Sequence, residues 1–179
     1  MSSHAHRGEP GADLSTLTLD DLQAFILSAH GQQLETARVA AQEHAYYSKH
    51  PQEVRRQWAK LSLLANRRMP DYAEGPSARV AQQEFMLRMW VIDRLGPDET
   101  DADWSPEALA SDTLDALPLT PTQAVALAED WRDRPTEQIR ELRRHKNLTT
   151  HLEGLVGYLE PGPVREQLVT WTAARRLLP

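Results

Sequence analysis

The sequence predicts an all-α fold, a compact multi-helix bundle of six to eight helices. Leucine and alanine, which favour helices, occur 46 times in the 179 residues, whereas the β-branched residues valine and isoleucine occur 11 times. Apolar residues recur at intervals of three and four positions in one segment after another, as they do on the buried face of a helix. Proline or a capping residue stands before most of these segments and marks where a helix can begin.

The chain is predicted to hold one domain and a tail, because its length is typical of a single domain. Residues 1–17 are mostly small and polar, which predicts a disordered N-terminal tail, and residues 18–179 are predicted to form a single helical domain. Within that domain, residues 93–117 are predicted to be a long acidic linker that contains one short helix.

The composition excludes several classes of protein and indicates a compartment. The chain has no cysteine, which excludes disulfides, thiolate metal sites and cysteine nucleophiles. It has no run of about 18 apolar residues that could span a bilayer, and its first residues lack the apolar core of a signal peptide. We therefore expect a cytoplasmic protein with no membrane partner. Arginine exceeds lysine by 17 to 3, a composition typical of bacteria with GC-rich DNA.

The first predicted helix begins after Thr18, whose hydroxyl can cap the helix. Gly31 interrupts the apolar pattern, which resumes beyond it. This part of the chain is therefore either one long helix or two helices joined near the glycine. The apolar positions before the glycine are Leu22, Phe25, Ile26 and Ala29.

Two longer helices and one short helix are predicted next. Pro51 stands at a favoured first position of a helix, and the Arg-Arg-Met-Pro sequence at 67–70 ends that helix. Residues 77–95 form the second, whose broad apolar face is typical of a central helix. The short helix of the acidic linker begins at Ser105, where Trp104 and Leu109 have the spacing of a hydrophobic staple.

The last third of the chain contains the clearest helix start. Thr-Pro-Thr-Gln at 120–123 combines a capping box with proline at the first helical position. A further helix is predicted from Pro135 to a short turn at 145–147, followed by another apolar stripe over 148–159. Glu-Pro-Gly-Pro at 160–163 then breaks the chain before the last helix.

The first candidate site is a polar cluster made of Glu43, His44, Tyr47 and His50. Glu43, Tyr47 and His50 recur with the spacing of one helix face, where a carboxylate, a phenol and an imidazole can move protons or hold a metal with one more ligand. The alternative interpretation is an ordinary polar helix end. No second Glu-x-x-His sequence is present to complete a di-iron site, so we expect no catalytic residue, no metal and no cofactor here.

The second candidate site consists of two basic stretches. Residues 49–68 carry a net charge of +5, and residues 132–146 carry +3. Clustered arginines can bind phosphates or carboxylates through paired hydrogen bonds, or they can pair with acidic residues of the same chain. The candidate residues for an anion or partner patch are Arg55, Arg56, Lys60, Arg67, Arg68, Arg140, Arg143 and Arg144.

The acidic segment changes the meaning of the overall charge. Residues 93–115 carry eight acidic residues and one arginine, a net charge of −7, while the whole chain carries −6. The rest of the chain is therefore not acidic, which weakens the argument against nucleic-acid binding. Trp104, inside this segment, is either the staple residue described above or an exposed anchor for a protein partner.

The leading functional hypothesis is a non-enzymatic interaction or regulatory protein that acts through helix faces and opposed charge patches, with a protein partner or as a homodimer. The sequence has no phosphate-binding glycine loop and no nucleophile motif. One alternative is a DNA-binding regulator, because residues 120–159 have the element order of a helix-turn-helix; nucleic acid is not favoured, since the reading helix offers no arginine, asparagine or glutamine to base edges. The other is a small helical enzyme or metal-binding protein that uses Glu43, Tyr47 and His50.

Overall fold

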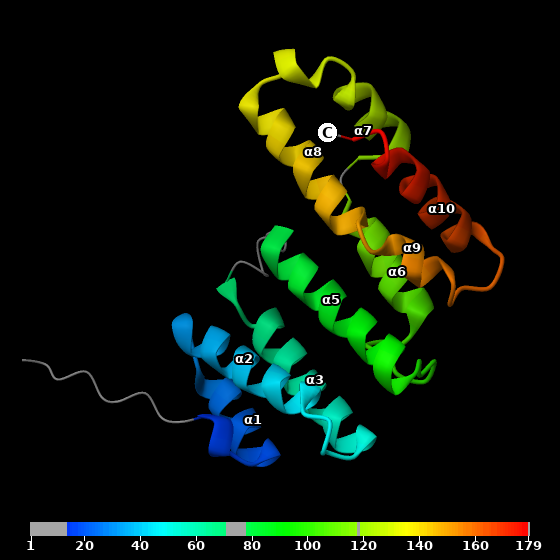
Figure 1. The fold of residues 1–179 in the computed structure, drawn as a ribbon. Coiled ribbons are helices and arrows are strands. Elements are labelled where there is room, and N and C mark those ends of the chain that lie inside the picture. Colours follow the sequence, from blue (N-terminus) through cyan, green and yellow to red (C-terminus); the bar gives the residue numbers. More distant parts are fainter. Residues whose placement is uncertain (1–13, 71–77, 118, 179) are drawn as a thin grey trace, which may run out of the picture. The chain divides into compact units, whose positions relative to one another are not determined.

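The computed structural model describes residues 14–70, 78–117 and 119–178. In this part the chain forms nine α-helices, eight of them seven residues or longer, and no strand (Figure 1). The predicted all-α class is therefore confirmed, and the eight longer helices agree with the predicted six to eight. None of the helices in the described ranges combines the length and the apolar character that crossing a membrane requires.

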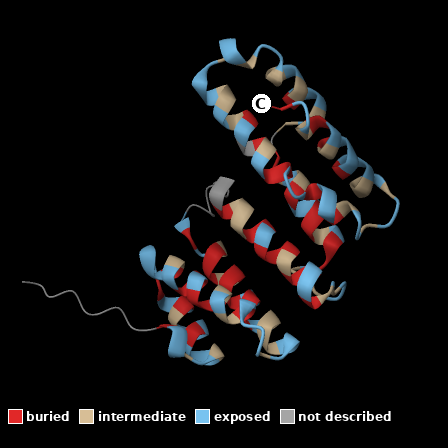
Figure 2. Ribbon diagram, viewed as in Figure 1, coloured by how far each residue is buried: buried red, intermediate tan, exposed pale blue. Residues whose placement is uncertain are grey.

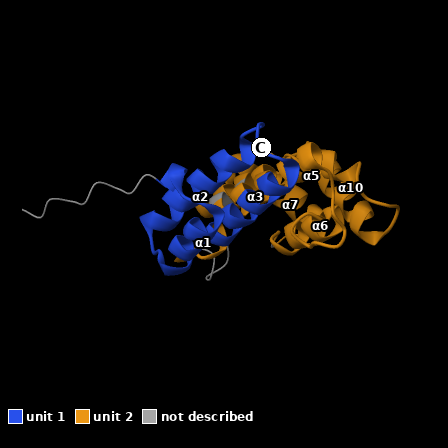
Figure 3. Ribbon diagram, turned by 90° about the horizontal axis from the view of Figure 1, so that it is seen from below, with its two compact units in different colours: residues 1–65 blue, residues 66–179 orange. Residues whose placement is uncertain are grey.

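The chain divides into two compact units, unit 1 with residues 1–65 and unit 2 with residues 66–179 (Figure 3). The single domain expected for residues 18–179 stays a prediction. Of the tail expected for residues 1–17, residues 1–13 lie outside the described part. The 3-10 helix η1 (Leu14–Thr16) follows them, and Leu14 is buried.

The helix boundaries of unit 1 follow from a capping residue and a glycine that can be recognised in the sequence. Its helices are α1 (Leu19–Ser28), α2 (Gln32–Tyr46) and the greater part of α3 (Gln52–Arg67). Thr18 caps α1, because its hydroxyl accepts a hydrogen bond of 3.2 Å from the backbone N–H of Asp21. The chain forms two helices and not one at Gly31, whose φ of 52° is a conformation that glycine adopts far more easily than other residues. Both η1 and α1 pack against α2.

Unit 2 is arranged around its last helix, which packs against four others. Its helices are α5 (Ala78–Leu95), α6 (Pro106–Asp115), α7 (Pro121–Ala128), η2 (Trp131–Asp133), α8 (Thr136–Thr149), α9 (Leu152–Val156) and α10 (Pro163–Arg175). Helix α10 packs against α6, α7, α8 and α9, and α5 packs against α6 and α8. Figure 2 shows their buried inner faces. The large apolar residues of the shared core include Phe85, Met89, Ile92, Leu109, Leu142, Leu148, Leu152, Leu155, Leu168 and Trp171.

Two helix starts in unit 2 confirm the predicted caps. The Ser105 hydroxyl accepts a hydrogen bond of 3.3 Å from the backbone N–H of Ala108 at the start of α6. At the start of α7, the Thr120 hydroxyl accepts from the N–H of Gln123 at 3.2 Å, and the Gln123 side chain accepts from the N–H of Thr120 at 2.9 Å. Both donors of the predicted capping box are therefore satisfied.

The predicted turn at 145–147 is wrong, because α8 continues through it to Thr149. His145 is completely buried, and its ring stacks on that of Trp171 with the centroids 5.7 Å apart. Nothing in this stretch breaks a helix as glycine or proline would, and the Thr149 hydroxyl donates back to the carbonyl of His145 at 2.7 Å. The chain turns at residues 150–151, and α9 has only five residues.

The acidic segment 93–117 contains the predicted short helix, α6, and its apolar residues face the inside of unit 2. Trp104 is 1 % exposed, and Leu109, the fourth residue of α6, is 2 % exposed. Both members of the predicted staple therefore lie in the interior. The apolar side chains of the segment therefore contribute to the core of unit 2, and its acidic side chains lie towards the surface.

Candidate functional site

The rings of the predicted polar cluster lie close together in unit 1, in stacked, tilted and edge-on pairs. The His44 ring lies on the Trp58 ring with centroids 4.2 Å apart and an angle of 17° between the planes. His50 lies 5.7 Å from His44 and 5.1 Å from Tyr47, also measured between centroids. The Nε2 of His44 is 2.8 Å from the carbonyl oxygen of Ser15 and donates to it, because a carbonyl can only accept. His44 therefore ties η1 to α2.

Glu43, the carboxylate of the predicted cluster, is exposed and lies away from these rings, in a groove. It lines a shallow groove of about 390 Å³ together with Leu14, Ser15, Thr36 and Val39. No group of three or more histidine, aspartate or glutamate side chains in the described ranges is arranged to hold a metal ion. The imidazoles of His44 and His50 are thus packed against aromatic rings, and Glu43 lies in the groove instead.

The predicted basic patch is divided between the two units and contains residues in different situations. The Arg55 guanidinium donates to the carbonyl of Ala45 at 2.8 Å and so satisfies the end of α2. Arg140 forms an exposed ion pair of 3.2 Å with Glu137 on α8. Arg56 is partly buried, Lys60, Arg68 and Arg143 are exposed, and the side chain of Arg144 lies outside the described part.

Arg67, the remaining member, pairs with the acidic segment. Its guanidinium donates to Glu84 on α5 and to Asp103 in the acidic segment, each at 2.7 Å. Burial by itself lowers the pKa of Arg67, but the hydrogen bonds and charges of Glu84 and Asp103 outweigh it and raise the pKa above its ordinary value. Arg67 is therefore held permanently charged within unit 2, as the pairing interpretation of the basic stretches expects.

Sequence reasoning missed Arg88, the most deeply buried arginine among the described side chains, at 2 % exposed. Its guanidinium donates to the backbone carbonyls of Ala102 at 2.8 Å and Asp103 at 3.0 Å, and to the carboxylate of Asp112 at 2.6 Å. It thereby joins α5 to the loop and helix of the acidic segment. The available signal was its position, three residues after Phe85 and four before Ile92, within the apolar stripe of α5.

Trp104, the predicted partner anchor, belongs to the interior of unit 2. Its side chain is among the largest fully buried ones in the described chain. The loop that carries it is closed by a 2.9 Å hydrogen bond from its own N–H to the carbonyl of Asp101 and a 3.2 Å bond from the N–H of Asp98 to the carbonyl of Trp104. In this conformation the indole offers no surface to a partner, and the staple interpretation fits its burial.

The predicted reading segment of the DNA-binding alternative is partly turned inward. Leu148 and Thr149 are buried at the end of α8, and Leu152 and Leu155 are buried in α9. His151 is exposed, with its ring 6.3 Å from that of Phe85. A DNA-binding role for residues 120–159 stays a prediction.

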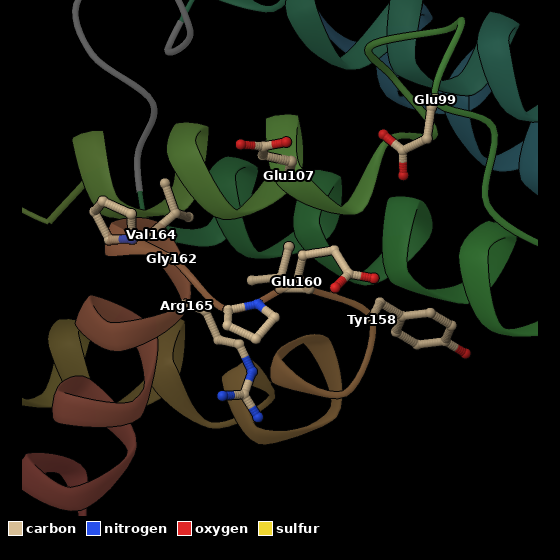
Figure 4. Close-up of a pocket in the computed structure, with 10 residues that line it drawn as sticks. Glu99, Glu107, Tyr158, Glu160, Gly162, Val164 and Arg165 are labelled. Carbon is tan, nitrogen blue, oxygen red and sulfur yellow. The ribbon is translucent and has the colours of Figure 1, made fainter.

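Unit 2 has an open groove of about 560 Å³, which we call the Glu160 groove. Figure 4 shows Glu107 on the first turn of α6, Glu160 in the turn that leads into α10, and Arg165 on the first turn of α10. Glu99 comes from the loop between α5 and α6. The residues that line the groove are Glu99, Glu107, Tyr158, Leu159, Glu160, Pro161, Gly162, Pro163, Val164 and Arg165.

The charged side chains of the Glu160 groove differ in whether they have hydrogen-bond partners. Glu99 accepts a hydrogen bond of 2.7 Å from the hydroxyl of Ser105. In contrast, no hydrogen bond or ion pair with another described residue involves the side chains of Glu107, Glu160 or Arg165. Three glutamates and one arginine make the lining negative, with a net charge of −2.

Tyr158, which lines the groove, is hydrogen-bonded to a further acidic residue, Asp93. Its hydroxyl donates to the carboxylate of Asp93, at the end of α5, over 2.7 Å. This hydrogen bond, followed by partial burial and the charge of Asp93, raises the pKa of Tyr158 above its ordinary value. The bond fixes the turn after α9 to α5.

The groove was not predicted, although its turn was. The Glu-Pro-Gly-Pro sequence at 160–163 was interpreted as a helix break. The two rigid prolines that interrupt the helix also form part of the groove wall. No protein-family model matches this chain, and neither a curated protein nor a solved structure is detectably similar to it. The geometry and charge of the groove therefore carry the functional argument.

Proposed function

We propose that this protein is a non-enzymatic interaction protein of the bacterial cytoplasm that binds a basic segment of a partner protein in the Glu160 groove. The observation that carries the proposal is an open cavity of about 560 Å³ with carboxylates that no described neighbour neutralises. Cavities of this size accommodate a few side chains of a peptide. The negative lining selects for lysine and arginine.

Several carboxylates around one cavity are needed for this selection. An exposed ion pair contributes only about 0–1 kcal/mol, so a single glutamate would not discriminate between partners. A basic side chain between Glu107 and Glu160 would interact with both, and the negative field of the groove would speed the approach of a positively charged segment.

The uncharged part of the lining supports the same ligand. The aliphatic stem of a lysine or arginine can lie against Pro161, and a guanidinium can stack on the face of Tyr158. Arg165 provides a donor for a carbonyl or carboxylate of the same segment, which would give the bound peptide a direction. The prolines keep the wall rigid, and this lowers the entropy lost on binding.

Binding is favoured over catalysis by the hydrogen bonds of two hydroxyls, that of Tyr158 in the groove and that of Ser105 behind its wall. The Ser105 hydroxyl, which donates to Glu99, also caps α6 and is buried, so it supports the wall and is not positioned as a nucleophile. The Tyr158 hydroxyl donates its proton to Asp93 in a hydrogen bond, and its raised pKa disfavours the phenolate that a general base would need. These groups maintain the shape of the groove.

The test is binding of a fluorescent peptide of arginine, lysine and glycine residues, measured by anisotropy at low salt, with a glutamate peptide of equal length for comparison. The basic peptide should bind and the acidic peptide should not. The double variant Glu107→Lys/Glu160→Lys should bind the basic peptide about ten-fold more weakly or worse, because both carboxylates are reversed.

The matched control is Glu129→Lys/Glu137→Lys, which makes the same change in net charge at two exposed positions of unit 2 that do not line the groove. It should keep the affinity of the unmodified protein within about two-fold. Equal weakening by the two double variants would show that the peptide responds only to overall charge, and that result would overturn the proposal. Absence of binding at low salt would overturn it as well.

A further inference from the structure

Arg165 is the positive member of a groove whose other charged residues are acidic. Among the described residues that line the Glu160 groove, it alone is basic, and three are glutamates. Opposite charges in one cavity attract each other, yet Arg165 forms no ion pair or hydrogen bond with a described glutamate. Arg165 is also partly buried, so water solvates its charge less well than that of an exposed arginine.

The turn before α10 holds Arg165 apart from the carboxylates. Glu160 precedes the turn and Arg165 lies in the first turn of α10, with Pro161 and Pro163 between them. Each proline fixes its own φ angle, so this backbone has little freedom to bring the two charged side chains together. In Figure 4 the Arg165 guanidinium points away from the carboxylates of Glu107 and Glu160. The groove therefore has a negative part and a separate positive part.

A ligand that matches the whole groove carries both charges, one for each part. We infer that the basic segment of the proposed function, on which this inference rests, is the C-terminal end of a polypeptide whose last residue is arginine or lysine. At such an end, one residue supplies both a cationic side chain and a carboxylate. An internal basic segment supplies only the cation, because its backbone carbonyls are neutral.

The two charges of this last residue have different partners in the groove. Its carboxylate binds Arg165, because a guanidinium offers two parallel N–H donors to the two oxygens of a carboxylate. Its cationic side chain lies between Glu107 and Glu160, as the proposed function requires. Capture of a chain end by its carboxylate is a recurring way in which proteins recognise peptides.

Arg165 also selects against other basic peptides. A chain that ends in an amide, or that continues past its basic residue, reaches the guanidinium without offering it an anion. The partly buried guanidinium then loses contact with water and gains no charged partner in return. Such peptides should therefore bind about ten-fold more weakly than a free chain end.

Two peptides that differ only at the C-terminus test the inference. Both consist of glycine residues followed by two arginines, carry a fluorophore at the N-terminus, and end either in a free carboxylate or in an amide. The amide form has one more net positive charge, so attraction to a negative groove alone would make it bind more tightly. We expect the opposite order: anisotropy at low salt should show the free carboxylate binding about ten-fold more tightly than the amide.

Arg165→Met should remove this preference. The variant loses the partner of the carboxylate and has a more negative lining, so it should bind the amide peptide at least as tightly as the unmodified protein does. The matched control is Arg143→Met, which makes the same change in charge at an exposed position of unit 2 outside the groove. It should keep the preference of about ten-fold. Neither side chain is buried, so circular dichroism should show both variants folded.

Free arginine carries the same two charges and is the competing ligand. The groove is open and has a volume of about 560 Å³, so the residues before the last one should add contacts. Free arginine should therefore displace the fluorescent peptide only at about ten-fold higher concentration or more. Displacement at equal concentration would overturn the assignment to a polypeptide end.

The outcomes separate the inference from the proposed function. If both peptides bind the unmodified protein equally, or the amide binds more tightly, the groove binds basic segments and the inference is overturned. If Arg165→Met keeps the preference, or Arg143→Met loses it, Arg165 does not bind the carboxylate and the inference is overturned. If neither peptide binds, the proposed function fails and the inference fails with it.

Discussion

Two regions of unit 2 combine acidic side chains with arginine, and they treat the charges in opposite ways. In the first region Arg88 is buried, and its donors bind Asp112 and two backbone carbonyls of the acidic segment. In the Glu160 groove the side chains of Glu107, Glu160 and Arg165 have no such partners among the described residues.

The number of charged residues in a region therefore does not show whether they stabilise the fold or bind a ligand. Charges that are desolvated and paired hold elements together, because removing one partner leaves the others in a poor environment. Charges that are solvated and unpaired contribute little to folding and are left for a ligand. The predictions below test this division by measuring how much stability each region loses.

The largest effect is expected for Arg88→Met. The carbonyls of Ala102 and Asp103 lose their donor, and we expect the free energy of unfolding to fall by about 2–4 kcal/mol. Urea denaturation followed by tryptophan fluorescence measures the loss. Arg140→Met, which removes an exposed pair, should change stability by less than about 0.5 kcal/mol. Equal stability of the two variants would remove the distinction between the regions.

A smaller loss, about 1–2 kcal/mol, is expected for Arg67→Met. Arg67 binds Glu84 and Asp103, but its side chain is 34 % exposed, so water screens part of the interaction. The same denaturation experiment in high salt should reduce the difference between this variant and the unmodified protein. A loss as large as that of Arg88→Met would show that Arg67 is as strongly coupled as the buried arginine.

Tyr158→Phe should cost about 0.5 kcal/mol, and the cost should depend on pH. The pKa of Tyr158 is raised in the folded protein, so the hydrogen bond to Asp93 stabilises the fold below the ordinary tyrosine pKa of about 10 and is lost as pH rises through the folded value. Thermal melting at pH 8 and above pH 10 measures this difference. If the variant is equally destabilised at both pH values, the hydrogen bond is not its cause.

The smallest effect is expected for Glu107→Gln/Glu160→Gln. These carboxylates have no described partner, so unfolding free energy should stay within about 0.5 kcal/mol of the unmodified protein while peptide affinity falls. The same denaturation and anisotropy measurements separate the two properties. A stability loss above about 1 kcal/mol would assign the groove carboxylates to the structural class.

The sequence predicted helix starts well and one helix end poorly. The Thr18 and Ser105 caps and the capping box at 120–123 were predictable, because each is satisfied within its own first turn. The turn at 145–147 was not, since its polar residues tolerate a helix and the buried contact of His145 with Trp171 keeps them in one. That contact joins residues of two helices and leaves no local signal.

The candidate sites show the same limit. His44, Tyr47 and His50 do gather, but the prediction that Glu43, Tyr47 and His50 share one helix face is wrong, because α2 ends at Tyr46 and both Tyr47 and His50 lie beyond it. The partners of His44 are the Trp58 ring and the Ser15 carbonyl, neither of which the spacing includes. The Glu160 groove draws Glu99 and Glu160 from distant parts of the chain. A charge pattern therefore identifies groups that can act, and folding selects which of them meet.

By itself, the sequence determined that this protein is helical and where most helices begin, because propensity, capping and apolar spacing act over a few residues. Tertiary structure alone decided that Trp104 lies in the interior and that the donors of Arg88 are hydrogen-bonded to the acidic segment. It also left the Glu160 groove open. The physical reason is that burial and pairing depend on contacts between distant residues, and these determine whether a charge or an apolar side chain stabilises the fold or faces a partner.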